Sequence, residues 1–135
     1  IIEKPGKLSE VEWEIMKQHS KNGVEIVMET GITSAIALMI ISQHHENHAS
    51  SGYPTGINSL RLSIYSNMAA IVDVYDAITS KRPYANRESG FNAVRLLLLK
   101  KKLYNAKILA KFIDMLGVDR GMNASAENLS GQSVF

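Results

Sequence analysis

Residues 60–80, LRLSIYSNMAAIVDVYDAITS, show the clearest structural pattern in the chain. Apolar side chains recur there at spacings of four and three, at Ile64, Met68, Ile71, Tyr75 and Ile78. This periodicity predicts a long helix with one face turned toward a core. Pro83 disfavours helical geometry at the residue before it, so we expect the helix to end near Ser80.

A first helix is predicted to begin near Ser9, because Glu12 follows at the spacing at which the two residues cap one another. Its apolar stripe is expected to face the interior and to reach His19 one turn further on. The residues of this stripe are Val11, Ile15 and Trp13. Gly23 is expected to interrupt or bend the chain.

Other segments predict further helices. A short helix over residues 24–30 should be closed by Gly31, and a helix over residues 33–45 should be capped by Thr33 or Ser34. Two more are expected over residues 87–104 and 106–117, the last closed by Gly117. The predicted fold class is therefore all-α, a bundle of about five or six helices over residues 1–117, with a loose tail at 118–135.

Composition agrees with one compact domain. The 135 residues are 45% hydrophobic and 21% charged, which suits a domain with its own core. The formal net charge of +2 is too small to indicate a nucleic-acid partner by itself. The longest apolar run is far shorter than the ~20 residues that a membrane span needs, so we expect a cytoplasmic location. The start at Ile1, without a methionine, is consistent with part of a longer polypeptide.

Residues 46–58 are predicted to form an ordered loop, called the signature loop below, with Tyr53 packed beneath it. Turn-forming residues cluster there, namely Ser50, Ser51, Gly52, Pro54, Gly56 and Asn58.

The candidate metal ligands are His19, His44, His45 and Asp73. Without cysteine, a metal must be held by imidazole and carboxylate. Consecutive residues on a helix point about 100° apart, so His44 and His45 can serve one centre only if the helix ends there or if two ions lie side by side. Asp73 lies one turn from an alanine on each side, where a buried carboxylate requires a cation.

Each candidate also has a plain structural interpretation. A single histidine on an apolar stripe can be a core residue whose ring bonds to a backbone carbonyl. His48 is expected to face solvent, and Tyr104 and Trp13 to serve packing.

Three blocks resemble the HD-GYP family of bacterial signalling phosphodiesterases: KPGKLSEVEWEIMKQH at 4–19, HHENHASSGYPTGI at 44–57 and IVDVYDAITSKRPY at 71–84. The resemblance covers roughly residues 3–117. It implies an all-helical HD-type fold that binds two or three divalent metals, with iron or manganese favoured and zinc, magnesium or nickel as alternatives. It also implies hydrolysis of cyclic di-GMP and an upstream sensor or receiver domain.

The resemblance also implies roles for particular residues. His19, His44, His45 and Asp73 match metal ligands of the family. Substrate-binding positions are matched by Gly52, Tyr53 and Pro54 in the signature loop and by Arg82 near the ligand phosphate.

The sequence also departs from the family pattern. The His-Asp pair that names the superfamily occurs nowhere in these residues, and Ala49, Ser50 and Ala85 replace residues that are common in the family. We therefore expect these residues to be inactive alone. The alternative function is a degenerate, non-catalytic module that binds a nucleotide or, at the signature loop, a partner protein. A helical bundle without metal is a third interpretation.

Overall fold

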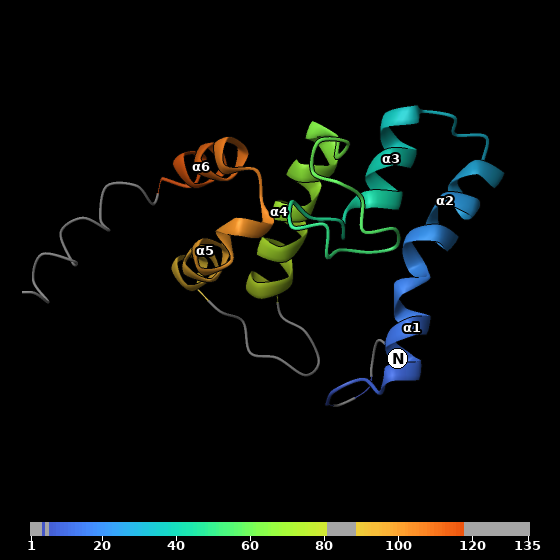
Figure 1. Ribbon diagram of the computed structural model, residues 1–135, viewed down its shortest axis with the longest axis horizontal. Coiled ribbons are helices and arrows are strands. Elements are labelled where there is room, and N and C mark those ends of the chain that lie inside the picture. Colours follow the sequence, from blue (N-terminus) through green and yellow to red (C-terminus); the bar gives the residue numbers. More distant parts are fainter. Residues whose placement is uncertain (1–3, 5, 81–88, 118–135) are drawn as a thin grey trace, which may run out of the picture.

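The computed structural model of the chain describes residues 4, 6–80 and 89–117 (Figure 1). All regular elements in these ranges are helical, which confirms the all-α prediction. The α-helices are α1 Glu10–Lys17, α2 His19–Glu29, α3 Ala35–Gln43, α4 Ile64–Thr79, α5 Gly90–Leu99 and α6 Ala106–Met115; η1 Lys101–Leu103 is a short 3-10 helix. The predicted tail, 118–135, lies outside the described residues.

Local caps explain where these helices begin. A side-chain oxygen accepts a hydrogen bond from a first-turn amide in α1, α3, α4, α5 and α6, an interaction worth about 1 kcal/mol each. The capping residues are Ser9, Ser34, Ser63, Ser89 and Asn105. Ser9 and Glu12 form the predicted reciprocal capping box. Gly31 and Gly117, both with positive φ, follow the ends of α2 and α6 as predicted.

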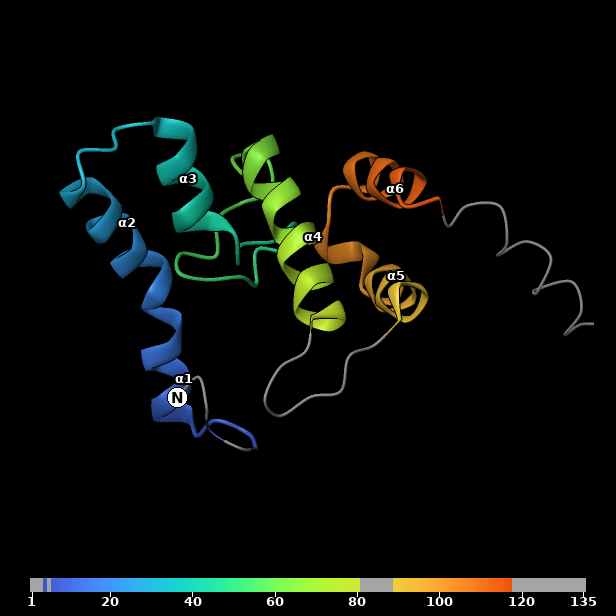
Figure 2. The ribbon, with the colours of Figure 1, turned by 180° about the vertical axis from the view of Figure 1, so that it is seen from behind.

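The core lies around α4, which packs against α3, α5 and α6. In Figures 1 and 2, α4 stands between α3 on one side and the pair α5 and α6 on the other. The buried apolar cluster consists of Ile71, Leu97, Tyr104 and Leu109, so Tyr104 is a packing residue as expected. None of the helices in the described ranges has the length and apolar character needed to cross a membrane.

The predicted burial of the first helix is wrong. Val11, Ile15 and Trp13 are 71%, 55% and 46% exposed, and His19 is exposed as well. Helix α1 lies at one end of the described structure and packs mainly against α2. A periodic pattern shows that a helix has an apolar face, but it does not show which segment covers that face.

The predicted interruption at Gly23 is also wrong, because α2 continues through it. The break falls instead at Gln18, which separates α1 from α2. A Cβ atom at Gly23 would lie 2.9 Å from Cγ2 of Ile41 in α3. The glycine therefore permits the close approach of α2 and α3 rather than a bend.

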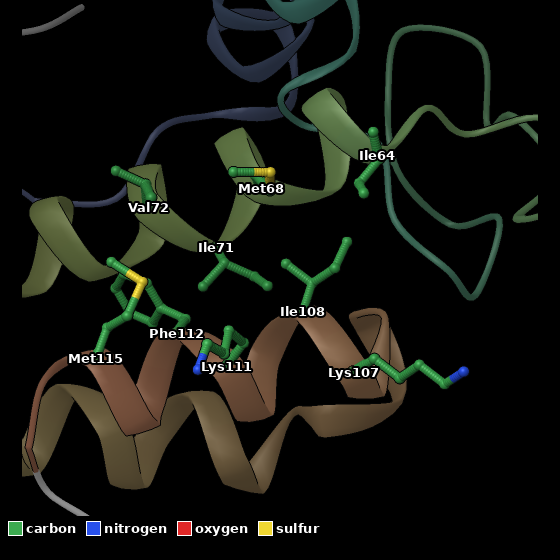
Figure 3. Close-up of a pocket in the computed structure, with 9 residues that line it drawn as sticks. All are labelled: Ile64, Met68, Ile71, Val72, Lys107, Ile108, Lys111, Phe112 and Met115. Atoms are coloured by element: carbon green, nitrogen blue, oxygen red, sulfur yellow. The ribbon is translucent and has the colours of Figure 1, made fainter.

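The α4 stripe is only partly buried. Ile71 is 1% exposed as predicted, whereas Ile64 and Met68 are 58% and 49% exposed. These two residues line an apolar groove of about 370 Å³ between α4 and α6. Figure 3 shows that the opposite wall comes from α6, with the two lysines beside the apolar side chains; the α6 residues are Lys107, Ile108, Lys111, Phe112 and Met115.

Candidate metal centre

Three histidine side chains converge where α2 begins and α3 ends. His19 is the first residue of α2, His44 is the C-cap of α3, and His45 follows it. The Nε2 atom of His19 lies 3.1 Å from Nε2 of His44 and 3.0 Å from Nε2 of His45. Because α3 ends at Gln43 and the chain turns at His44 and His45, both adjacent imidazoles can reach Nε2 of His19.

The tautomers of His19 and His44 follow from their backbone partners. Nδ1 of His19 lies 2.6 Å from the carbonyl oxygen of Met16, and Nδ1 of His44 lies 2.8 Å from that of Ile41. A carbonyl only accepts, so each Nδ1 carries a hydrogen and each neutral ring has its lone pair at Nε2. Two lone pairs facing each other cannot form a hydrogen bond, so this arrangement favours a cation between them.

Asp73, on α4, lies beside the cluster. Its Oδ2 atom is 3.7 Å from Nδ1 of His45, which is too long for a hydrogen bond. Burial, and then the neighbouring His44 imidazole, lowers the pKa of His45 to about 4, although the Asp73 carboxylate opposes this shift. His45 is therefore neutral at pH 7, the state that a metal ligand requires.

The donors fit a divalent transition metal. Two nitrogens that are each about 2.1 Å from one ion lie about 3.0 Å apart at a ligand angle of about 90° and about 3.4 Å apart at a tetrahedral angle. The Nε2 atom of His19 lies 3.1 Å and 3.0 Å from those of His44 and His45, close to this range. Imidazole together with carboxylate suits zinc, iron or manganese. His19, His44 and His45 form a group whose ligand atoms lie within 4.8 Å of one another, and Asp73 stands just outside it.

The signature loop places Tyr53 against the histidines. The Tyr53 ring centroid lies 4.5 Å from that of His45, at 32° between the planes, and 6.2 Å from that of His19. On the side of α1, Trp13 meets Tyr53 edge-on with centroids 5.8 Å apart. The burial of Tyr53, and then Asp73, raises the pKa of the phenol to about 12. Tyr53 therefore keeps its proton at neutral pH.

The site contains one residue that the sequence reasoning missed. Glu46 is 1% exposed, and its carboxylate accepts hydrogen bonds from Thr55 and Ile57 across the signature loop. The signal in the sequence was a carboxylate directly after two histidines. The burial of Glu46 could not be read from that signal, because it depends on how the loop folds back.

The structure describes some of the other residues singled out in the sequence, while others lie outside the described ranges. Gly52 lies directly against the backbone of residues 45–47, and Pro54 is exposed. Arg82 and Ala85 lie outside the described residues. The expectation that His48 faces solvent is wrong, because its Nε2 atom is buried without a partner in the described structure and its backbone amide donates to Leu103.

A hydrogen-bond network joins the end of α3 to the start of α4. The hydroxyl of Ser66 donates to Oε1 of Gln43 at 2.8 Å, and Ser63, the N-cap of α4, lies 2.8 Å from the same hydroxyl. This network connects the helix that carries Asp73 with the residue that precedes the paired histidines.

Comparison with known proteins identifies the family to which the chain belongs. Residues 1–108 match the family model described as HD domain. A protein of Pseudomonas aeruginosa named cyclic di-GMP phosphodiesterase is 31% identical over 118 residues, which cover 87% of this chain and 28% of that relative. A Thermotoga maritima protein named cyclic di-GMP phosphodiesterase is 34% identical over 117 residues, covering 85% and 32%.

A third relative, the 3'3'-cGAMP-specific phosphodiesterase 2 of Vibrio cholerae, is 40% identical over 85 residues, covering 62% of this chain and 16% of that protein. The chain thus spans about a third or less of the length of these curated relatives. The family match includes every element that contributes to the histidine cluster. The chain therefore belongs to the HD domain family.

Proposed function

We propose that this chain is part of a metal-dependent phosphodiesterase of the HD-GYP type that hydrolyses cyclic di-GMP. The observation that carries the proposal is the convergence of the Nε2 atoms of His44 and His45 on Nε2 of His19, at 3.1 Å and 3.0 Å. Two of these atoms have lone pairs fixed by backbone bonds to the opposite ring nitrogen. Relatives named as cyclic di-GMP or 3'3'-cGAMP phosphodiesterases support the substrate class, a cyclic dinucleotide.

The proposed roles follow from the position of each side chain. His19, His44 and His45 hold the metal, and Asp73 completes the ligands or orients His45 from its Nδ1 side. A bound divalent metal supplies an activated water and neutralises charge on the phosphoryl oxygens. Tyr53 shields one face of His45 from water, and its phenol, protonated at neutral pH, can donate a hydrogen bond to a phosphate.

The signature loop and Arg82 are proposed to bind the substrate. Tyr53 lies against the His45 imidazole, and Gly52 and Pro54 flank it in the loop. A guanidinium such as that of Arg82 suits a phosphate oxygen pair.

A second candidate is a non-catalytic module that binds a nucleotide or a partner protein at the signature loop. It is favoured by the number of ligands, because the described histidines assemble around one point, whereas phosphodiester cleavage often uses two metals about 4 Å apart. One occupied metal position is enough to order the loop without supplying turnover.

One experiment separates these functions. The protein, as expressed from its gene, is loaded with Mn²⁺ or Fe²⁺, its metal content is measured by elemental analysis, and consumption of cyclic di-GMP is followed by chromatography. Turnover that requires bound metal and stops with a chelator is the expected result. If calorimetry shows tight binding of cyclic di-GMP to a metal-loaded sample that does not turn it over, the catalytic function is rejected in favour of the binding module. Absence of bound metal would contradict both metal-containing proposals.

A further inference from the structure

Resting on the proposed function, we propose that Glu46 is a positioning residue: it ties the two halves of the signature loop together and, through Tyr53, sets the orientation of the metal-binding imidazoles. Glu46 itself contacts none of the three candidate ligand atoms by a hydrogen bond in the described structure. Its influence on the metal is therefore indirect.

The first step is the environment of the Glu46 carboxylate. One oxygen accepts from the backbone amide of Thr55 at 2.7 Å and from its hydroxyl at 2.9 Å, and the other accepts from the amide of Ile57 at 3.0 Å. Among the described residues no cation pairs with this carboxylate within 4 Å. A buried carboxylate is costly unless such donors satisfy it, so the loop amides and Glu46 depend on each other.

The second step is a close backbone contact beside these bonds. A Cβ atom on Gly52 would lie 2.5 Å from Cα of Glu46 and 2.5 Å from the carbonyl oxygen of His45. The amide of Tyr53 also donates to that carbonyl oxygen at 3.3 Å. The loop therefore contacts residues 45 and 46 at Gly52, directly before Tyr53, and forms hydrogen bonds with Glu46 at Thr55, directly after Pro54.

The third step leads from the loop to the metal site. Tyr53 lies between these two attachment points, and its ring stacks on His45 and meets the edges of His19 and Trp13. The outer nitrogens of His19 and His44 have backbone carbonyl partners. Within the described part of the chain, the partner of Nδ1 of His45 is Asp73, at 3.7 Å. The orientation of His45 therefore depends on Tyr53 more than that of the other two rings does.

The consequence concerns metal affinity. Groups that hold ligands in place from outside the metal shell typically contribute about 10-fold to 100-fold to affinity or activity. Glu46→Gln keeps the side-chain size but turns one of the two acceptor oxygens into an amide donor, which would face an N–H group of the loop. We expect the loop to shift and Tyr53 to leave its position on His45.

Two readouts test this inference. The first is ¹⁹F NMR of protein labelled with 5-fluorotryptophan, with the Trp13 signal assigned by its loss in Trp13→Phe. Trp13 is the single tryptophan of the chain and contacts Tyr53, so its signal reports the position of that ring without any metal. The second is the dissociation constant for Mn²⁺ or Co²⁺. Glu46→Gln should shift the Trp13 signal and weaken metal binding about 10-fold to 100-fold.

Thr55 provides a matched pair outside the immediate neighbourhood of the histidines. Thr55→Val removes the hydroxyl bond to Glu46 and should change both readouts in the same direction, but by less than Glu46→Gln. Thr55→Ser retains that bond and should behave like the unaltered protein. If Glu46→Gln fails to fold, the comparison of Thr55→Val with Thr55→Ser tests the role of Glu46 instead.

Leu109→Ala is the control for general destabilisation, because Leu109 lies in the apolar core on α6. It should lower the melting temperature and leave the Trp13 signal and the metal affinity unchanged. The inference is overturned if Glu46→Gln or Thr55→Val behaves like Leu109→Ala. If the unaltered protein binds no metal, the proposed function fails, while the Trp13 signal still decides whether Glu46 positions Tyr53.

Discussion

Helix α4 has two sides that are organised in different ways. On the side of α3, Asp73 faces an imidazole cluster held by hydrogen bonds to carbonyl oxygens and by the stacked ring of Tyr53. On the side of α6, Ile64 and Met68 line an open groove of apolar side chains. A hydrogen bond holds the His19 ring in place even though His19 is exposed. Apolar side chains have no such bond, so they are fixed in position only where other side chains pack against them from all sides.

The largest expected effect tests the polar side. His44→Ala removes an imidazole whose Nε2 atom lies 3.1 Å from Nε2 of His19. We expect metal affinity to fall by at least about 100-fold, the upper end of what a group outside the metal shell contributes. Elemental analysis and titration with Mn²⁺ measure the loss, and circular dichroism checks that the helices remain. Unchanged metal content would show that the cluster is not a metal site.

The next effect tests the apolar side. Leu109→Ala should lower the free energy of unfolding by about 2–5 kcal/mol, because it leaves a cavity in a packed core. Met68→Ala, at a half-exposed position in the groove, should cost less than about 1 kcal/mol. Urea unfolding of the two variants compares the buried core, which contains Leu109, with the open groove, which contains Met68. Equal losses would mean that the groove is covered in solution.

A smaller effect is expected at Gly52. Its Cβ position is blocked by backbone atoms of His45 and Glu46, so Gly52→Ala should cost about 1–3 kcal/mol, as overpacking usually does. Gly23→Ala is the matched control, because the atom in its way is a side-chain methyl carbon, Cγ2 of Ile41, rather than a backbone atom. Chemical unfolding should therefore show a larger loss for Gly52→Ala than for Gly23→Ala.

The smallest effect concerns α1, which, like the histidine cluster, is ordered by directional bonds rather than by burial. Hydrogen bonds from Lys4 and from the backbone amide of Ser9 lower the pKa of Glu12 from 4.5 to about 2. A depressed carboxyl pKa contributes stability that is present above pH 4.5 and is lost as the pH falls through 2. Helical circular dichroism should decline slightly over that range, and Glu12→Gln should remove this dependence.

Local patterns were sufficient for most of the fold. The starts of the helices at Ser9 and Ser34 and the end of α2 before Gly31 were predictable, because a cap involves atoms only a few residues apart. The convergence of His44 and His45 was also foreseen as one of two alternatives, since a helix end allows it. The burial of the α1 stripe and of Met68 was predicted wrongly, because burial depends on distant segments.

The sequence by itself determined the helical class, the capping residues and the kinds of donor available to a metal, because these depend on short-range spacing and side-chain chemistry. Only the tertiary structure decided that Glu46 is buried under Thr55 and Ile57, that Tyr53 stacks on His45, and that α4 has an open apolar side. These features arise where segments separated in the sequence meet. Periodicity within one segment contains no information about its partner.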